Sequence, residues 1–398
     1  MPPPATVAPS AALRREDLLR VAAPLRSLLS AAPYAPPEGS DTSVKSLLAS
    51  LLPSPSEPPT GGAGKEAVDL LLFCAAARAA SAEAPALHWV PEGLSRAAAA
   101  AMEEMAAMGG WGGVPEMLVA MMPEALPPLK AVLKDTGVDA NDDMMMIGAV
   151  KPPKEHAFVA AHQFRWLLSQ VNYPKLGDLC WLVIPCALTA LDHWSPDVKT
   201  TPQQGMISFM HIAKNVKVAD LSLYEDAILD ACCHNIPADD ELWYRVVEVS
   251  VLLLTCTQRS NPRSPWYDRI LSEMLGHLER KTTKQRTSCC MAYPYRASFG
   301  CHGPLPIGTF SSPVLERVHT FIKLTWIRKS PYTSRLVDEL VLLYKESATR
   351  KSREIMRNHI VEILVLLQKC KGQQFEEAWK KHEADPDLTL LLSRFQEL

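Results

Sequence analysis

The cysteine and histidine residues between positions 277 and 302 are the first group whose types could do chemistry. Thiolate and imidazole are the ligands that zinc prefers, and a set of them occurs here: Cys289, Cys290, Cys301 and His302, with His277 upstream. Structural zinc sites usually take ligands two to four residues apart, whereas adjacent Cys-Cys and Cys-His pairs cannot easily turn toward one metal. We therefore expect an irregular loop here, with a zinc enzyme as the alternative.

A glycine-rich run at Gly61–Lys65, GGAGK, is similar to the end of a phosphate-binding loop. Pro59 stands where the first glycine of that motif belongs, and Glu66 stands where its magnesium-binding hydroxyl belongs. No strand is expected before it. Glycine-rich runs beside proline-rich ones are ordinary spacers, so we interpret this segment as a flexible linker.

Nucleophilic catalysis needs a nucleophile, a base and an orienting carboxylate in one cleft, and no motif in the chain marks such a set. His193, His211 and His234 lie near the ends of expected helices, where histidine commonly forms cap or interhelical hydrogen bonds. The sequence therefore predicts a protein without enzymatic activity, catalytic residues, cofactor or bound metal.

A basic and aromatic corner between two expected helices is the best candidate for partner binding. Aromatic and arginine side chains are over-represented in interface hot spots. The alternative is a tryptophan packed in the core with solvated charged neighbours. We predict partner contacts at Trp326, Arg328, Lys329 and Tyr332.

The elements that must position these residues are predicted to be helices throughout. Residues 182–216 form two short amphipathic helices joined by a turn, each with apolar residues at i, i+3, i+4 and i+7. The stripes are Ile184, Ala187, Leu188 and Leu191, then Met206, Phe209, Met210 and Ala213. Such hairpins are stable when stacked on similar neighbours. The predicted fold is therefore all-α, an α-solenoid of HEAT/armadillo-like helical hairpins.

Helix starts are marked by a capping residue followed by proline, as at Thr201-Pro202. Thr201 and Gln204 also have the spacing of a capping box, in which each side chain satisfies a backbone N–H of the first turn.

Composition divides the chain into four segments. Residues 1–64 are Pro/Ala-rich and of low complexity, which predicts a partly disordered segment with short helices near 12–30 and 42–52. Residues 65–280 are predicted to form the helical repeat array. Residues 281–311 lack a helical period and predict an irregular loop. Residues 312–398 are predicted to carry the C-terminal helical repeats.

The charge is uneven, because residues 280–371 hold 17 Lys/Arg against 6 Asp/Glu, a balance of +11 that leaves −14 for the rest. These basic residues are scattered without a nucleic-acid reading motif, so we expect no nucleic-acid partner. The ten cysteines lie mostly on apolar helical faces, which is typical of reducing compartments. No apolar run is long enough to span a bilayer. The expectation is a cytoplasmic or nuclear protein without a membrane partner.

The region from Tyr173 to Asn235 resembles the signature region of the Tel-two-interacting protein two (Tti-two) family, and residues 325–347 resemble its plant members. The resemblance covers roughly residues 155–398 and rests on packing and turn motifs. These are Tyr173-Pro174, the helix reaching Ile184-Pro185, Leu191-Asp192-His193, Gly205 and Ala219-Asp220-Leu221.

This resemblance implies a HEAT-like, non-enzymatic subunit of the three-protein TTT complex. That complex works with the Hsp-ninety chaperone to mature and stabilise the phosphatidylinositol-3-kinase-related kinases. The implied partners are the two other TTT subunits and, through the complex, these kinases and the chaperone machinery. The chain departs from the family pattern at residues 281–311, where further helices would be expected. The alternative function is a generic armadillo/HEAT adaptor for protein transport or assembly.

Overall fold

The computed structural model describes residues 13–36, 43–55, 62–80, 84, 86–135, 153–192, 200–235, 243–258, 261, 264–274, 276, 319, 333–346, 353–388 and 391. All regular secondary structure in these ranges is helical, so the predicted all-α class is confirmed for them. The chain packs as two compact units, Met1–Leu223 and Tyr224–Leu398.

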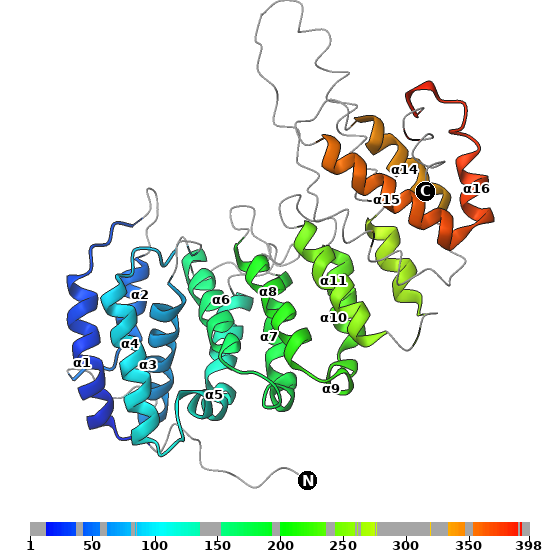
Figure 1. Cartoon of the computed structure of the whole chain (residues 1–398). Coiled ribbons are helices and arrows are strands. Elements are labelled where there is room, and N and C mark those ends of the chain that lie inside the picture. Colours follow the sequence, from blue (N-terminus) through cyan, green and yellow to red (C-terminus); the bar gives the residue numbers. More distant parts are fainter. Residues whose placement is uncertain are drawn as a thin grey trace, which may run out of the picture. The chain divides into compact units, whose positions relative to one another are not determined.

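The first unit contains nine α-helices among the described residues, and α1 to α8 stand side by side in it (Figure 1). They are α1 (Arg15–Ala31), α2 (Val44–Ser50), α3 (Gly62–Ala79), α4 (Glu92–Met108), α5 (Val114–Asp135), α6 (Lys154–Ser169), α7 (Cys180–Asp192), α8 (Thr200–Asn215) and α9 (Val218–Ser222), with a 3₁₀ turn at Gly177–Leu179.

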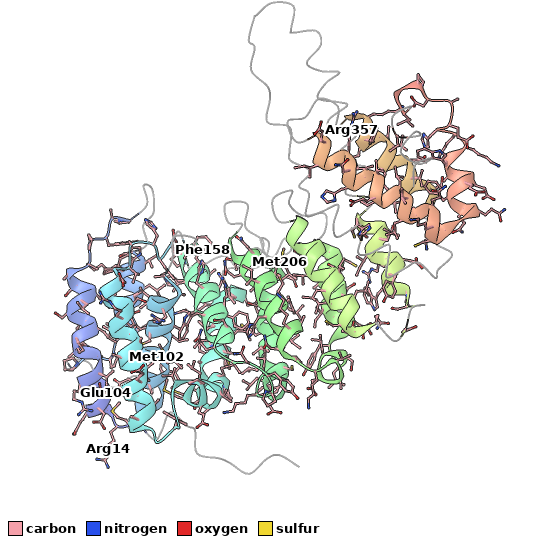
Figure 2. The ribbon with its side chains drawn as sticks, viewed as in Figure 1. Arg14, Met102, Glu104, Phe158, Met206 and Arg357 are labelled. Carbon is pink, nitrogen blue, oxygen red and sulfur yellow. The ribbon has the colours of Figure 1, made fainter. Side chains whose placement is uncertain are left out.

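The second unit contains two sets of packed helices among its described residues. In the first set, α10 (Glu225–Asn235) packs on α11 (Trp243–Thr257). In the second set, α14 (Thr333–Glu346), α15 (Arg353–Lys371) and α16 (Gln373–Trp379) pack on one another. On α15, the Arg357 guanidinium lies over the Tyr344 ring, 4.5 Å from its centroid (Figure 2).

The core of the first unit is built around α3, which packs on α1, α4, α5 and α6. Leu70 to Ala77 are buried without interruption, over more than two turns of helix. A helix with no polar face over such a length must be covered on every side. A buried hydrogen bond of 2.9 Å, donated by Gln163 Nε2 of α6 to the Leu72 carbonyl, also joins α3 to its neighbour.

Both helices expected in the N-terminal segment are present, as α1 and α2, and they pack into the first unit. The Arg15 Nε lies 3.1 Å from Glu66 Oε1 at the start of α3. Glu104 of α4 lies beside α1 (Figure 2), with its Oε1 3.0 Å from Arg20 Nη2. Residues 13–36 and 43–55 therefore contribute to the packed unit. The flexible linker predicted at Gly61–Lys65 is wrong for Gly62 to Lys65, because α3 begins at Gly62.

The helices α7 and α8 form the hairpin predicted for residues 182–216. Six of the eight predicted stripe residues are buried, and Leu188 and Met210 are half-buried. The two backbones approach closely at Gly205, where a Cβ would lie only 2.7 Å from Leu191 N and 2.9 Å from its Cα. A glycine is required here because any side chain would collide with the backbone of α7.

The predicted capping box at the start of α8 is wrong. The helix begins at Thr200, so Thr201 lies within its first turn, and the Thr201 hydroxyl is buried without a hydrogen-bond partner among the described residues. The Gln204 side chain accepts a hydrogen bond of 3.0 Å from Arg165 Nη1 of α6 instead. The Gln204 side chain, which the local pattern had assigned to the cap, therefore binds a residue of another helix.

Candidate protein-interaction surface

The connection between α6 and α7, residues 170–179, is fastened to the core at several points. Val171, Leu176 and Leu179 are buried. The Val171 carbonyl lies 2.9 Å from His211 Nε2 on α8, and since a carbonyl can only accept, this ring nitrogen carries the proton and donates it. These contacts hold the connection in one position against α8.

Two aromatic side chains of this region point away from the core. Tyr173 follows the buried Val171 and is 58% exposed, and Trp181 in the first turn of α7 is 59% exposed. The Tyr173-Pro174 peptide bond is cis. Large exposed aromatic side chains on a firmly held backbone are typical of protein-interaction sites.

The short helix α9 and the residue that follows it, Leu223, contribute two more exposed apolar side chains. Leu221 is buried and anchors α9, while Val218 is 49% and Leu223 is 81% exposed. Two contacts bring the segments together. Lys217 Nζ lies 5.6 Å from the centroid of the Tyr173 ring, and a Cβ on Gly177 would lie 3.0 Å from Asp220 Oδ2.

We call this region the exposed aromatic surface, and define it by Tyr173, Trp181, Val218 and Leu223 with the neighbouring Lys214 and Lys217. Six large apolar side chains of the described residues are well exposed, and four of them occur between residues 173 and 223. The remaining two are Leu28 on α1 and Ile355 on α15.

The charges around the surface differ in how far they are already compensated. Asp178 and Asp220 lie at the N-terminus of α7, where the helix dipole favours negative charge. Burial, followed by these two carboxylates, raises the pKa of the Cys180 thiol to about 11. Lys175 forms an ion pair of 3.7 Å with Glu116 of α5. Lys214 and Lys217 are exposed and form no ion pair with a described residue.

The sequence predicted the partner contact elsewhere. Trp326, Arg328, Lys329 and Tyr332 lie outside the described residues, as do the cysteines and histidines of the possible zinc group, His277 included. That contact therefore stays a prediction. Among the residues that the structure does describe, no three His, Cys, Asp or Glu side chains gather as metal ligands would.

Two of the three histidines considered as bases have structural partners, and His193 lies outside the described residues. His211 holds Val171, and Asn215 Nδ2 donates to the His211 carbonyl at 3.0 Å. His234 Nδ1 lies 2.9 Å from the Asp230 carbonyl one turn earlier on α10. The bond of His211 joins α8 to the connection after α6, as the prediction required, whereas the bond of His234 stays within α10 and is neither a cap nor an interhelical bond.

The thiols of the buried cysteines have low reactivity. Burial raises the pKa of the Cys74 and Cys186 thiols to about 12, and that of Cys233 to about 11. The thiolate is the nucleophilic form, so these thiols are poor nucleophiles at neutral pH. They fill space in the core as small apolar groups.

Sequence reasoning missed the exposure of Tyr173 and Trp181. Trp181 stands three positions before the buried Ile184, so the helical period places it at the edge of the apolar stripe and does not predict its exposure. Within the described ranges, no helix has both the length and the apolar character needed to cross a membrane.

Comparison with known proteins gives one informative match. Uncharacterized protein At2g39910 of Arabidopsis thaliana is 42% identical over 407 aligned positions, which cover 94% of this chain and 92% of that protein. No family model matches the chain, and no solved structure matches it.

Proposed function

We propose that this chain, which belongs to the family of the Arabidopsis protein At2g39910, acts as a scaffold for other proteins and has no enzymatic activity. The observation that carries the proposal is the exposed aromatic surface, in which Tyr173, Trp181, Val218 and Leu223 are open to solvent beside a rigid core. A protein that keeps such side chains exposed on ordered segments commonly covers them with a partner.

The packing order of the first unit supports an α-solenoid. The main contacts of α7 and α8 are with each other and with α5 and α6, and those of α5 and α6 extend to α3. Packing of each helix pair on the adjacent pairs is characteristic of HEAT and armadillo arrays. Arrays of this kind offer long faces to partner proteins, and a stable interface typically buries more than about 1,000 Å².

The specific role that we propose is that of a TTT-type cochaperone subunit of the Tti-two kind. It would support the maturation and stability of phosphatidylinositol-3-kinase-related kinases together with the Hsp-ninety chaperone, in the cytoplasm or nucleus. The residues that resemble that family, Tyr173 to Asn235, include the exposed aromatic surface and the Gly205 contact. The use of His211 and of the buried thiols for structure supports a non-enzymatic role.

The proposal is tested by affinity purification of the tagged full chain from its native cells, with quantitative mass spectrometry. The expected result is co-purification of the two other TTT subunits and at least one kinase of this class. Depletion of the chain should also lower the abundance of these kinases. If neither the subunits nor a kinase are recovered, and kinase abundance does not change on depletion, the TTT role is wrong.

A further inference from the structure

We propose that the exposed aromatic surface binds an acidic segment of a partner protein, which places a large apolar side chain against Tyr173 and Trp181 and its carboxylates against Lys214 and Lys217. This inference rests on the proposed function, because it specifies the partner that a protein-binding scaffold would take at this site.

The apolar part of the surface sets the first requirement on the partner. Tyr173 and Trp181 each leave more than half of their surface open, and Leu223 leaves more still. Aromatic side chains of this size contribute strongly to binding when a partner excludes water from them. A matching segment therefore needs at least one large apolar or aromatic side chain.

The charges set the second requirement. Lys214 lies exposed in the last turn of α8, and Lys217 precedes α9 with its Nζ 5.6 Å from the centroid of the Tyr173 ring. Neither forms an ion pair with a described residue, and Lys217 makes only a loose contact with the Tyr173 ring. Asp178 and Asp220 are set against the N-terminus of α7, and Lys175 is paired with Glu116. Uncompensated positive charge therefore remains, which favours carboxylates on the partner.

The backbone is already arranged for binding. The hydrogen bond between His211 and Val171, with the buried Leu176 and Leu221, fixes both segments that carry the exposed side chains. A preorganised surface pays little entropy when it is covered, so a short partner segment can be sufficient.

The test is a selection from a phage-displayed library of random 16-residue peptides on the immobilised full chain. We expect the enriched peptides to combine Leu, Phe or Trp with several Asp or Glu. Selection on the K214E/K217E variant should enrich peptides with Lys or Arg instead. The best peptide should bind the wild-type chain at least tenfold more tightly than it binds K214E/K217E or the W181S variant, and binding should weaken with added salt.

Matched controls separate this surface from general effects. Lys134→Glu reverses a charge in the last turn of another helix of the same unit, and Leu28→Ser removes an exposed apolar side chain from α1. Both variants should bind the selected peptide as the wild type does. Circular dichroism of every variant checks that it remains folded.

Three results would overturn the proposal. The first is that the enriched peptides contain no excess of acidic residues. The second is peptide binding that W181S and K214E/K217E leave unchanged. The third is tighter binding of a single-stranded RNA 20-mer than of the best peptide, since the lysines would then serve phosphate groups.

The two proposals can fail separately. If the TTT subunits co-purify equally with wild type and with the W181S variant, and no acidic peptide is selected, the scaffold function stands and this assignment of the surface is wrong. If charge-selective peptide binding is found but no TTT subunit co-purifies, the surface assignment stands and the cochaperone role is wrong.

Discussion

Single residues decide how closely the helices of the first unit approach, and Gly205 is the clearest case. A methyl group at this position would lie 2.7 Å from Leu191 N, so Gly205→Ala must push α8 away from α7. We expect the free energy of unfolding to fall by roughly 1–3 kcal/mol, the usual cost of overpacking. Urea denaturation followed by circular dichroism measures it.

Gly93 provides the matched control, because it also lies in a helix but has no atom within 4 Å of the position of an added Cβ. Gly93→Ala should leave stability unchanged or raise it by up to about 1 kcal/mol. Equal effects of the two substitutions would show that the contact with Leu191 does not limit packing.

His162 on α6 makes stability depend on pH. Its ring is buried, and burial, followed by the nearby Arg165, lowers its pKa from 6.5 to about 4. The unfolded chain therefore takes up a proton first as the pH falls. Stability is fully present above pH 6.5 and decreases toward pH 4, by about 2 kcal/mol between pH 7.5 and pH 5.

The contribution of His162 is isolated by comparison with His162→Gln, which cannot titrate. The wild type should lose about 2 kcal/mol more than this variant when urea denaturation is repeated at pH 5. Parallel pH profiles for the two proteins would contradict the assignment.

At the level of elements, the apolar spacing of α7 and α8 was sufficient to predict both helices and to name six of the residues that they bury. Local spacing predicts this well because burial follows the helical period. The role of Gln204 could not be predicted in the same way, because Arg165, its partner, lies 39 positions earlier. Tyr173 was noted only as part of a motif, since its exposure depends on how Val171 and Leu176 are anchored.

Thiol reactivity tests how tightly the elements are packed. Cys74 on α3 and Cys186 on α7 have pKa values raised by burial to about 12, which lowers their thiolate fraction about a thousandfold relative to an ordinary thiol. In the native chain, iodoacetamide should modify the half-exposed Cys370 before Cys74 and Cys186, as followed by mass spectrometry. In denaturant the three should react alike. Native modification of Cys74 at the rate of Cys370 would mean that α3 opens readily.

For the whole molecule, the division after Leu223 predicts two unfolding transitions. Each unit has its own buried core, so each should melt as its own cooperative step. Gly205→Ala should shift only the transition of Met1–Leu223. Phe375→Leu, which removes a ring stacked 5.6 Å from Trp379, should shift only the other, by roughly 1–2 kcal/mol.

Hydrogen exchange with mass spectrometry during the urea titration assigns each transition to its residues. One transition that both substitutions shift equally would contradict independent units.

The sequence also predicted the all-helical class of the whole molecule, but composition was a poor guide to its N-terminal part. Proline-rich runs favoured a linker before residue 65, yet α1 and α2 pack on helices from later in the chain. Lys45 Nζ donates to the Ala32 carbonyl at 2.7 Å just after α1 ends, and Arg15 reaches Glu66. Such contacts depend on the folded arrangement, so no local composition rule contains them.

The position of Gly205 affects how binding data on this protein should be interpreted. Gly205 lies near one end of the α7–α8 hairpin, and Trp181 and Lys214 lie at the opposite end. A displacement of α8 at Gly205 would therefore also shift Lys214, about 14 Å further along the helix, relative to Trp181. A mutational screen scored by binding alone would count Gly205 as a contact residue, although it is buried within the hairpin. Screens on this family therefore need a stability measurement for each variant before a binding loss is attributed to the surface.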